Sequence, residues 1–462
     1  MYPIPPKSTC AYPRFALSFA KSPNMEQPLP STAMIPPADW SLAKTLGFRF
    51  KCIVFLGYIF SNPNGVIPFT DDNGDNWYLQ PLHRLIPWLA QPFLHKPITI
   101  FTNGSGDTTY DYFVILFIVL LALIGSAIWS ILDRHRRSYP TLYYWLTVAV
   151  RYYLALTMLE YGMVKVIKLQ FPFPYLGRLL QPYGNSSPMG LAWTFMGYSR
   201  GYNYFAGFAE VTAGLLLFFR RTTTIGALLA FVVGAHIMAM NYCFDIPVKL
   251  LSTAIVLMAA WLLSDNAQQL VNLFFRSGEG RLTRIKAPTP KNRTWFLVGR
   301  IVKTLLIAYA LVGFLIADVK AMSQYGDDAP STALKGIYNI KTFIRNRDTL
   351  APLQTDTLRW KQLVLDGSPD YAYASIRAMN DSAKGYFSFK PDTVRHTITL
   401  TSYSDSTNKY AFLYRLPNKD SMVLLGAWRK DSLEIHLKLL DWKNLLLVRR
   451  GFHWINESPF NR

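Results

Sequence analysis

Seven polar side chains lie toward the ends of apolar segments in the middle of the chain: Glu160, Tyr161, Lys165, His236, Asn241, Asp245 and Lys249. At about 1.5 Å per residue along the expected helices, they come from three segments and reach a similar level. Polar groups that converge in apolar surroundings are typical of a binding or catalytic pocket. We therefore predict a pocket in which Lys165, His236 and Glu160 are the catalytic candidates and the other four residues bind. Taken singly, each residue is more often a satisfied structural group.

Lys165 has two chemical roles open to it. Desolvation would hold its amine neutral and let it act as a base, whereas a charged ammonium group would bind an anionic oxygen. Both roles fit the sequence. Lys168 follows almost one turn later and is expected to extend to the membrane interface, where it would anchor the helix.

Arg151 and Glu210 form a second expected pair. Arg151 lies roughly 18 Å along its helix, and Glu210 lies roughly 14 Å from the opposite end of the next, antiparallel helix. Charges at such a depth normally face a partner. Glu210 also shares a helix face with Gly207 and Gly214, whose small size lets a neighbouring backbone approach. An Arg151–Glu210 ion pair is therefore predicted, and its favoured role is to hold two helices together.

The composition indicates a membrane part joined to an extramembrane part. The 462 residues are 51% hydrophobic and only 16% charged, too apolar for an ordinary soluble enzyme. The three cysteines, Cys10, Cys52 and Cys243, are scattered and form no CxxC motif. Neither a disulfide framework nor a metal site is therefore expected.

Seven apolar segments approach the roughly 20 residues that a helix needs to cross a bilayer. They are residues 44–60, 112–132, 141–167, 201–219, 222–243, 246–263 and 295–316. Arg49 and Lys51 interrupt the first, and the fifth and sixth could form one broken hairpin at Asp245-Ile246-Pro247. The predicted fold class is an α-helical membrane bundle of about seven spans followed by a C-terminal, all-β antiparallel extramembrane domain.

Basic residues between the segments indicate an orientation. Arg134, Arg136 and Arg137 follow the second segment, Arg220 and Arg221 follow the fourth, and Arg276, Arg281, Arg284, Lys286, Lys291 and Arg293 precede the last. Cytoplasmic loops carry an excess of Lys and Arg, and alternating spans would place these three loops on one side. The N-terminus is then inside and everything after residue 320 outside. Because much of the net charge of +20 is explained in this way, nucleic acid is not an expected partner.

Proline is dense at the start of the chain, with nine prolines in the first 40 residues. Residues 1–43 are expected to form a disordered tail, in which Met25 is an alternative start to Met1. The predicted units that follow are 44–140, a transmembrane pair with an outer loop; 141–265, a four-helix membrane core; 266–320, a basic cytoplasmic loop and last span; and 330–462, the outer β domain.

The last unit alternates polar and apolar residues. Strands are expected at residues 396–403, 410–416, 422–428, 433–440 and 445–448, with two more at 371–379 and 386–390. Short turns such as Pro417-Asn418-Lys419-Asp420 separate them, which favours an antiparallel meander. A half-open barrel or a curved sheet is predicted. A binding or structural role is the default for this domain, because no catalytic triad or phosphate loop stands out.

Residues 141–265 resemble the DoxX-like membrane proteins. Arg151, Gly162 and Lys165 reproduce the spacing of that family's first helix. The run from Glu210 to Gly214, Glu-Val-Thr-Ala-Gly, resembles its next helix. The resemblance implies a four-helix module of the bacterial inner membrane. Some members of that family are implicated with thiosulfate-to-quinone oxidation and others with redox partners.

A more distant similarity links the same region to the membrane part of vitamin K-dependent gamma-carboxylases. Residues 164–169, Val-Lys-Val-Ile-Lys-Leu, resemble a VKKL run in those enzymes, and residues 236–241 resemble an HCMN run. Here Val-Ile separates the two lysines. The similarity implies Lys165 as a base that acts on a hydroquinone, with His236 assisting, and it implies no carboxylation substrate.

Together these observations predict a multi-pass protein of the bacterial inner membrane with a periplasmic β domain. Its expected role is redox-linked handling of a quinone, or of another amphipathic molecule such as a lipid, at the outer leaflet; a quinone-linked oxidoreductase component is one form of this role. The alternative is a non-enzymatic envelope assembly protein whose β domain binds a periplasmic partner. A transporter is a third alternative, although no convincing inverted repeat supports it.

Overall fold

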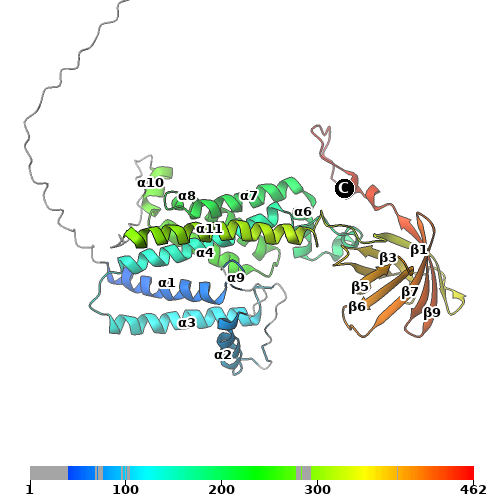
Figure 1. Ribbon diagram of the computed structural model, residues 1–462, viewed down its shortest axis with the longest axis horizontal. Coiled ribbons are helices and arrows are strands. Elements are labelled where there is room, and N and C mark those ends of the chain that lie inside the picture. The colour runs from blue at the N-terminus through cyan, green and yellow to red at the C-terminus, as the bar shows by residue number, and fades with distance from the viewer. Residues whose placement is uncertain are drawn as a thin grey trace, which may run out of the picture.

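The computed structural model describes residues 40–67, 70, 76–94, 97–98, 100, 105–276, 282, 293–381 and 383–461. A bundle of long helices lies at one end of the molecule and a β-barrel at the other (Figure 1). Residues 1–39 of the expected N-terminal tail lie outside the described residues, as does the basic loop 277–292 except Leu282.

Helices occupy all seven of the predicted apolar segments. The long ones are α1 (Leu42–Ser61), α3 (Thr109–Leu132), α4 (Pro140–Val166), α7 (Arg200–Leu217), α8 (Thr223–Cys243), α9 (Lys249–Ser264) and α11 (Arg293–Met322). The shorter ones are α2 (Gln80–Ala90), α5 (Leu176–Leu179), α6 (Pro188–Tyr198), α10 (Ala267–Phe275) and α12 (Leu446–Arg449), with 3-10 turns at Trp77–Leu79, Tyr183–Asn185 and Trp442–Asn444.

The prediction of about seven membrane spans is wrong. Among the described helices, three are long and apolar enough to cross a membrane: α3, α8 and α11. A fourth is reached if α9 and α10, which meet at an 83° bend, count as one span. The remaining long helices are too polar or too short, because α1, α4 and α7 carry charges along their length and α9 has only 16 residues. These three spans are compatible with a membrane protein.

Local sequence signals explain where several helices begin. Ser41 caps α1, and Ser199 caps α7 through its hydroxyl, which accepts from the Tyr202 amide. Thr108 and Asp111 form a reciprocal capping box at the start of α3. These caps satisfy amides that have no partner within the helix, and so they fix where the bundle helices start.

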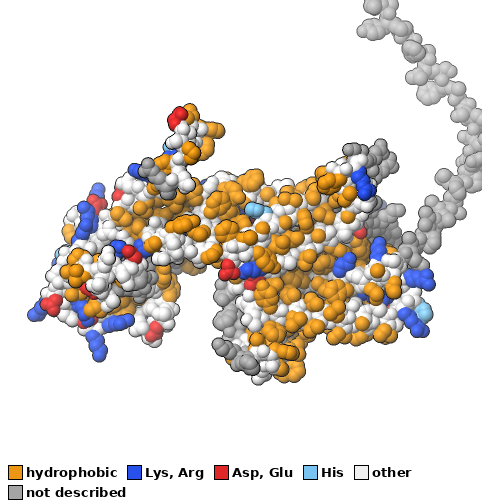
Figure 2. Space-filling view, turned by 180° about the vertical axis from the view of Figure 1, so that it is seen from behind, with side chains coloured by type: hydrophobic (Ala, Val, Ile, Leu, Met, Phe, Trp, Pro, Cys, Tyr) orange, Lys and Arg blue, Asp and Glu red, His pale blue; other side chains and the backbone are white. Residues whose placement is uncertain are grey.

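One end of the bundle collects the basic loops. The backbone carbonyl of Arg137, between α3 and α4, accepts from the Trp40 amide at 3.3 Å, next to the start of α1. Arg220, between α7 and α8, stacks on the ring of Tyr144 of α4. Lys and Arg side chains gather at the end of the bundle that points away from the barrel, while hydrophobic side chains cover much of its flank (Figure 2).

The C-terminal unit is a closed antiparallel barrel, so the expected half-open barrel or curved sheet is corrected. Its strands are β1 (Gly336–Arg345), β3 (Trp360–Asp366), β4 (Tyr373–Ala378), β5 (Ala383–Asp392), β6 (Thr397–Ser402), β7 (Lys409–Asn418), β8 (Ser421–Trp428) and β9 (Asp431–Leu440). Each pairs with the next, and β1 pairs with β9, which closes a ring of eight. The short β2 (Asp348–Thr349) extends the β1 edge.

Two of the eight barrel strands and the short β2 were missed, and one strand was wrongly predicted. β1 and β3 fall outside the predicted strands, although β1 closes the barrel. Residues 445–448 form no strand, since α12 begins at Leu446. Aromatic and aliphatic side chains fill the barrel interior, among them Phe343, Trp360 and Phe412, each at most 1% exposed.

The barrel is joined to the helical part through Asp366 at the end of β3. Its carboxylate accepts from the Leu176 amide at 2.8 Å, the Tyr373 hydroxyl at 2.9 Å and the Lys335 ammonium at 2.9 Å. Burial, together with the Asp366 carboxylate, raises the pKa of Tyr373 far above its usual value. Arg377 adds a bond to the Leu180 carbonyl at 2.7 Å. The segment between α4 and α6 therefore connects the two parts through these contacts.

Candidate ligand-binding site

Glycines bring α4 and α7 into backbone contact. A Cβ atom on Gly162 would lie 2.7 Å from the Val211 amide nitrogen, and one on Gly207 would lie 2.7 Å from the Gly162 carbonyl. One on Gly214 would lie 2.7 Å from the Ala155 carbonyl. Only glycine fits at such close approach. The glycines on α7 predicted to allow a close neighbour do so, and that neighbour is α4.

This contact places Lys165 of α4 beside Glu210 of α7. The Lys165 ammonium donates to Glu210 Oε2 at 2.8 Å and to the Tyr161 carbonyl at 3.3 Å. Both side chains are buried, with 7% and 2% of their surface exposed. An ammonium group has three N–H donors, so one of them is left for a ligand.

The predicted Arg151–Glu210 ion pair is wrong. Glu210 pairs with Lys165 instead, and the Arg151 guanidinium donates to the Thr223 hydroxyl at 3.4 Å. The depth argument failed because the outer ends of α4 and α7 are not level. Gly207 of α7 lies against Val166, the last residue of α4, so the first turns of α7 extend past α4. Glu210 is therefore near the end of α4 rather than its middle.

The ion pair lies on the wall of a cavity of about 460 Å³, which we call the inner cavity. α4, α6, α7, α8 and α9 contribute to it, together with the turn after α4. Apolar side chains make most of the wall, including Phe171, Trp193 and Phe205. A mostly apolar cavity with a few converging polar groups is typical of a small-molecule site.

Two further polar atoms on this wall lack a hydrogen-bond partner among the described residues. Gln170 Oε1 and Thr157 Oγ1 are buried and accept no hydrogen bond from the described residues. Buried polar atoms without a partner are rare in folded proteins. A ligand with hydrogen-bond donors would satisfy them.

Four of the predicted pocket residues meet at the inner cavity: Tyr161, Lys165, His236 and Asn241. His236 is exposed and lies at the edge of the cavity. Asn241 is buried, and its amide donates to the Val248 carbonyl at 3.2 Å, across the turn from α8 to α9. Asn241 therefore shapes the wall through a structural bond.

The other three predicted residues do not line the inner cavity. Asp245 is exposed and pairs with Lys249 at 3.0 Å. The Lys249 amide donates to Asp107, which caps α9. Glu160, half-buried on α4, is absent from the lining.

Lys168 departs from its expected role as an interfacial anchor. It is 4% exposed and forms an ion pair with Asp327, the carboxylate that also accepts from the Phe173 amide at 2.5 Å. Lys168 has φ of +64°, so the chain leaves the helical conformation at this residue. The ion pair ties the end of α4 to the segment between α11 and the barrel.

Sequence reasoning missed Glu210 as a pocket residue, together with Gln170, Trp193 and the whole contribution of α6. Glu210 was predicted only as the structural partner of Arg151. Residues 170–198 form short helices and turns that carry no span-length apolar pattern, so no local signal placed them at a site. Among the described residues, no group of three or more His, Cys, Asp and Glu side chains is arranged to hold a metal ion.

Comparison with known proteins identifies a relative. The chain is 36% identical over 126 residues to the uncharacterised protein YwoB of Bacillus subtilis strain 168, a match over 27% of this chain and 79% of YwoB. The chain belongs to the YwoB family. No protein-family model matches the chain, and no solved structure matches it. Because YwoB is itself described as uncharacterised, membership of its family assigns no activity, and the DoxX-like resemblance stays a prediction.

Proposed function

We propose that this member of the YwoB family binds a quinone or a similar amphipathic molecule in the inner cavity and takes part in its redox-linked handling. One observation carries the proposal: a buried Lys165–Glu210 ion pair forms part of the wall of a cavity that is otherwise mostly apolar. A quinone ring has flat apolar faces and two carbonyl oxygens at its edge. The cavity matches both features.

The residues suggest how each form of the ligand would be held. The free N–H of Lys165 would donate to a quinone carbonyl, while Gln170 Oε1 would accept from a hydroquinone hydroxyl. Lys165 already donates to a carboxylate at 2.8 Å, which favours the charged, anion-binding role over that of a neutral base. Reduction of a quinone takes up two electrons and two protons. The electrons would come from a partner redox protein and both protons from water, while the charged Lys165 would stabilise the anionic oxygen that forms during reduction.

We also propose the orientation and the compartment. The basic loops lie at the end of the bundle that points away from the barrel (Figure 2), and cytoplasmic ends of membrane proteins are rich in Lys and Arg. This arrangement supports a bacterial inner-membrane protein whose start is cytoplasmic and whose barrel is periplasmic.

A second candidate function concerns the barrel. Its interior is filled by side chains such as Trp360 and Phe412, which favours a partner-binding or assembly role for its outer surface over a ligand site inside it. This role in the envelope is compatible with ligand binding in the helical part.

Ligand binding tests the main proposal. The full chain would be purified in detergent, its organic extract analysed for quinones, and the protein titrated with 2,3-dimethoxy-5-methyl-1,4-benzoquinone by tryptophan fluorescence quenching. In the double variant Lys165→Met, Glu210→Gln, the charged donor is lost without leaving a buried charge. We expect about tenfold weaker binding or more, since a hydrogen bond to a charged group contributes about 1.5–3 kcal/mol.

Lys249→Met is the matched control, because Lys249 lies outside the inner cavity. Its affinity should stay within twofold of that of the unmodified chain. Equal affinity in the double variant and the control would refute the proposed site.

A further inference from the structure

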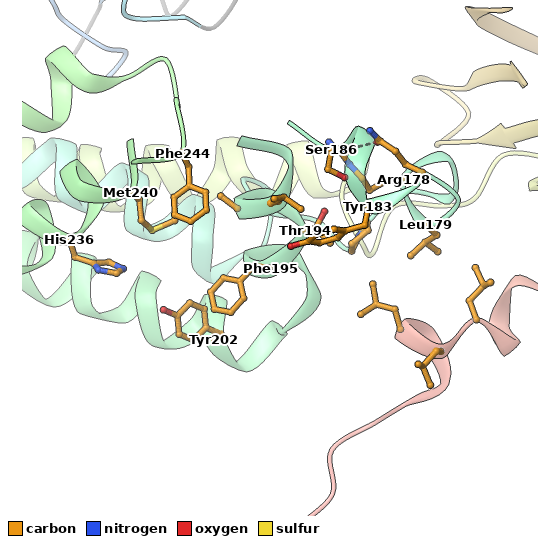
Figure 3. A pocket seen from close by; sticks show the side chains of 17 residues that line it. Arg178, Leu179, Tyr183, Ser186, Thr194, Phe195, Tyr202, His236, Met240 and Phe244 are labelled. Carbon is orange, nitrogen blue, oxygen red and sulfur yellow. Dashed lines mark hydrogen bonds between the residues drawn. The ribbon is translucent and has the colours of Figure 1, made fainter. Parts of the chain in front are cut away.

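A second hollow of about 910 Å³ adjoins the inner cavity, and we call it the outer groove. The segment Pro174–Ser186, α6, α7 and α8 line it on one side, and Leu445, Leu446 and Leu447 of the C-terminal segment line it on the other. Figure 3 shows the C-terminal segment facing the bundle, with His236 at one end of the lining and Arg178 toward the other.

Three residues line both hollows: Tyr202, His236 and Met240. The two spaces therefore adjoin at these side chains. Met240 is flexible, and His236 is exposed, so the boundary can open by side-chain rotation without a backbone change. After such a rotation the inner cavity and the outer groove would be continuous.

Both hollows are mostly apolar, and their polar groups lie in different places: in the inner cavity they are buried at one wall, whereas the outer groove carries Arg178, Gln181 and Ser186 on the segment that precedes α6. The inner cavity holds the Lys165–Glu210 pair and the unpartnered Gln170 oxygen. Next to the shared boundary, by contrast, the outer groove carries Phe195 and Phe244. A polar head would be recognised in the first space, and an apolar chain would lie in the second.

The C-terminal cover over the groove is held in place. The Tyr198 hydroxyl of α6 donates to the Arg450 carbonyl at 2.8 Å, immediately after α12. The barrel fixes the other end of this segment, because β9 ends at Leu440 and the 3-10 turn at Trp442–Asn444 follows it. α12 is therefore held in place as one wall of the outer groove.

We propose that the ligand is a long-chain amphiphile whose head lies in the inner cavity and whose apolar chain passes Tyr202, His236 and Met240 into the outer groove, beneath α12. The inference rests on the proposed function and specifies its substrate class. Phe195 and Phe244 of the groove are exposed, and hydrophobic side chains cover much of the flank of the bundle (Figure 2), so the chain would reach the groove from the lipid.

Chain length and groove volume would be varied together to test this inference. The probes are 2,3-dimethoxy-5-methyl-1,4-benzoquinone, which has no chain, and its decyl derivative. Leu446→Trp narrows the groove from the α12 side, and Leu191→Trp narrows it from α6. Leu413→Trp, at an exposed position on β7 of the barrel, is the matched control. The ratio of affinities between variant and unmodified chain cancels the partition of each probe into detergent.

We expect the decyl quinone to bind at least tenfold more weakly to both groove variants, because each methylene removed from a buried position weakens binding by about fourfold. The chainless quinone should bind all four proteins within twofold. An unchanged decyl affinity in both groove variants would overturn the inference, as would an equal loss for the two probes. If the chainless quinone fails to bind while the decyl quinone still depends on the groove, the groove is supported and the proposed head-group site is wrong.

Discussion

At the scale of single residues, the proposed site depends on the buried Lys165–Glu210 pair. Both side chains are shielded from water, and the opposite charges of Lys165 Nζ and Glu210 Oε2 lie 2.8 Å apart. Removing one partner from a buried pair leaves an uncompensated charge, whereas removing both with similar volume is often nearly neutral. Exposed pairs such as Lys249–Asp245 contribute far less because water screens them.

Glu210→Gln and Lys165→Met are each expected to lower the free energy of unfolding by about 3–5 kcal/mol. The double variant should recover most of that loss, since no buried charge is left unpaired. Thermal unfolding in detergent, followed by circular dichroism, measures the three variants against Asp245→Asn, which should change stability by about 1 kcal/mol or less. Purely additive losses would show that the two residues do not form a pair.

The site could be predicted in part at this scale. Counting rise per residue placed Tyr161, Lys165, His236 and Asn241 at a similar level, and the structure brings these four to one cavity. The same arithmetic failed for Glu210, because it assumed level helix ends. Gln170 could not be predicted as a site residue, since it follows α4 in a turn whose position depends on tertiary packing.

At the scale of elements, contact between α4 and α7 determines the geometry of the ion pair. Gly162 and Gly207 touch through their backbones, and this register holds Lys165 opposite Glu210. The barrel depends instead on a long-range pairing, in which Ile337 of β1 lies opposite Leu440 of β9. Local alternation predicts single strands, but it cannot show that the first strand returns to the last. That is why a half-open sheet was expected and a closed ring is observed.

Gly162→Ala tests the helix contact. The added Cβ would lie 2.7 Å from the Val211 backbone nitrogen, so the helices must move apart, and such overpacking typically costs about 1–3 kcal/mol. Gly299→Ala on α11 is the matched control, since its Cβ would have no neighbour within 4 Å. Unfolding in detergent should show lower stability for the first variant and equal or slightly higher stability for the second, because alanine favours helices by about 1 kcal/mol. Equal stability of both variants would contradict close packing at Gly162.

At the scale of the whole molecule, the basic loops and the barrel lie at opposite ends of the long axis. The helix bundle carries its basic loops at one end and the barrel at the other, and three described helices are apolar enough to cross a membrane between them (Figure 1). The connection through Asp366 and Leu176 keeps the barrel next to the end of the bundle where the inner cavity lies. Ligand and barrel-bound partner would therefore meet on one side of the membrane.

Accessibility of single cysteines measures that arrangement. In a background in which Cys10, Cys52 and Cys243 are replaced by alanine, Ser404→Cys reports on an exposed turn of the barrel and His135→Cys reports on the basic end. In spheroplasts of a bacterial host, a membrane-impermeant maleimide should label Ser404→Cys directly. His135→Cys should react only after permeabilisation, since the proposed orientation puts its basic loop in the cytoplasm. The reverse pattern would invert the orientation, and labelling of both positions without permeabilisation would rule out a barrier between the barrel and the basic end.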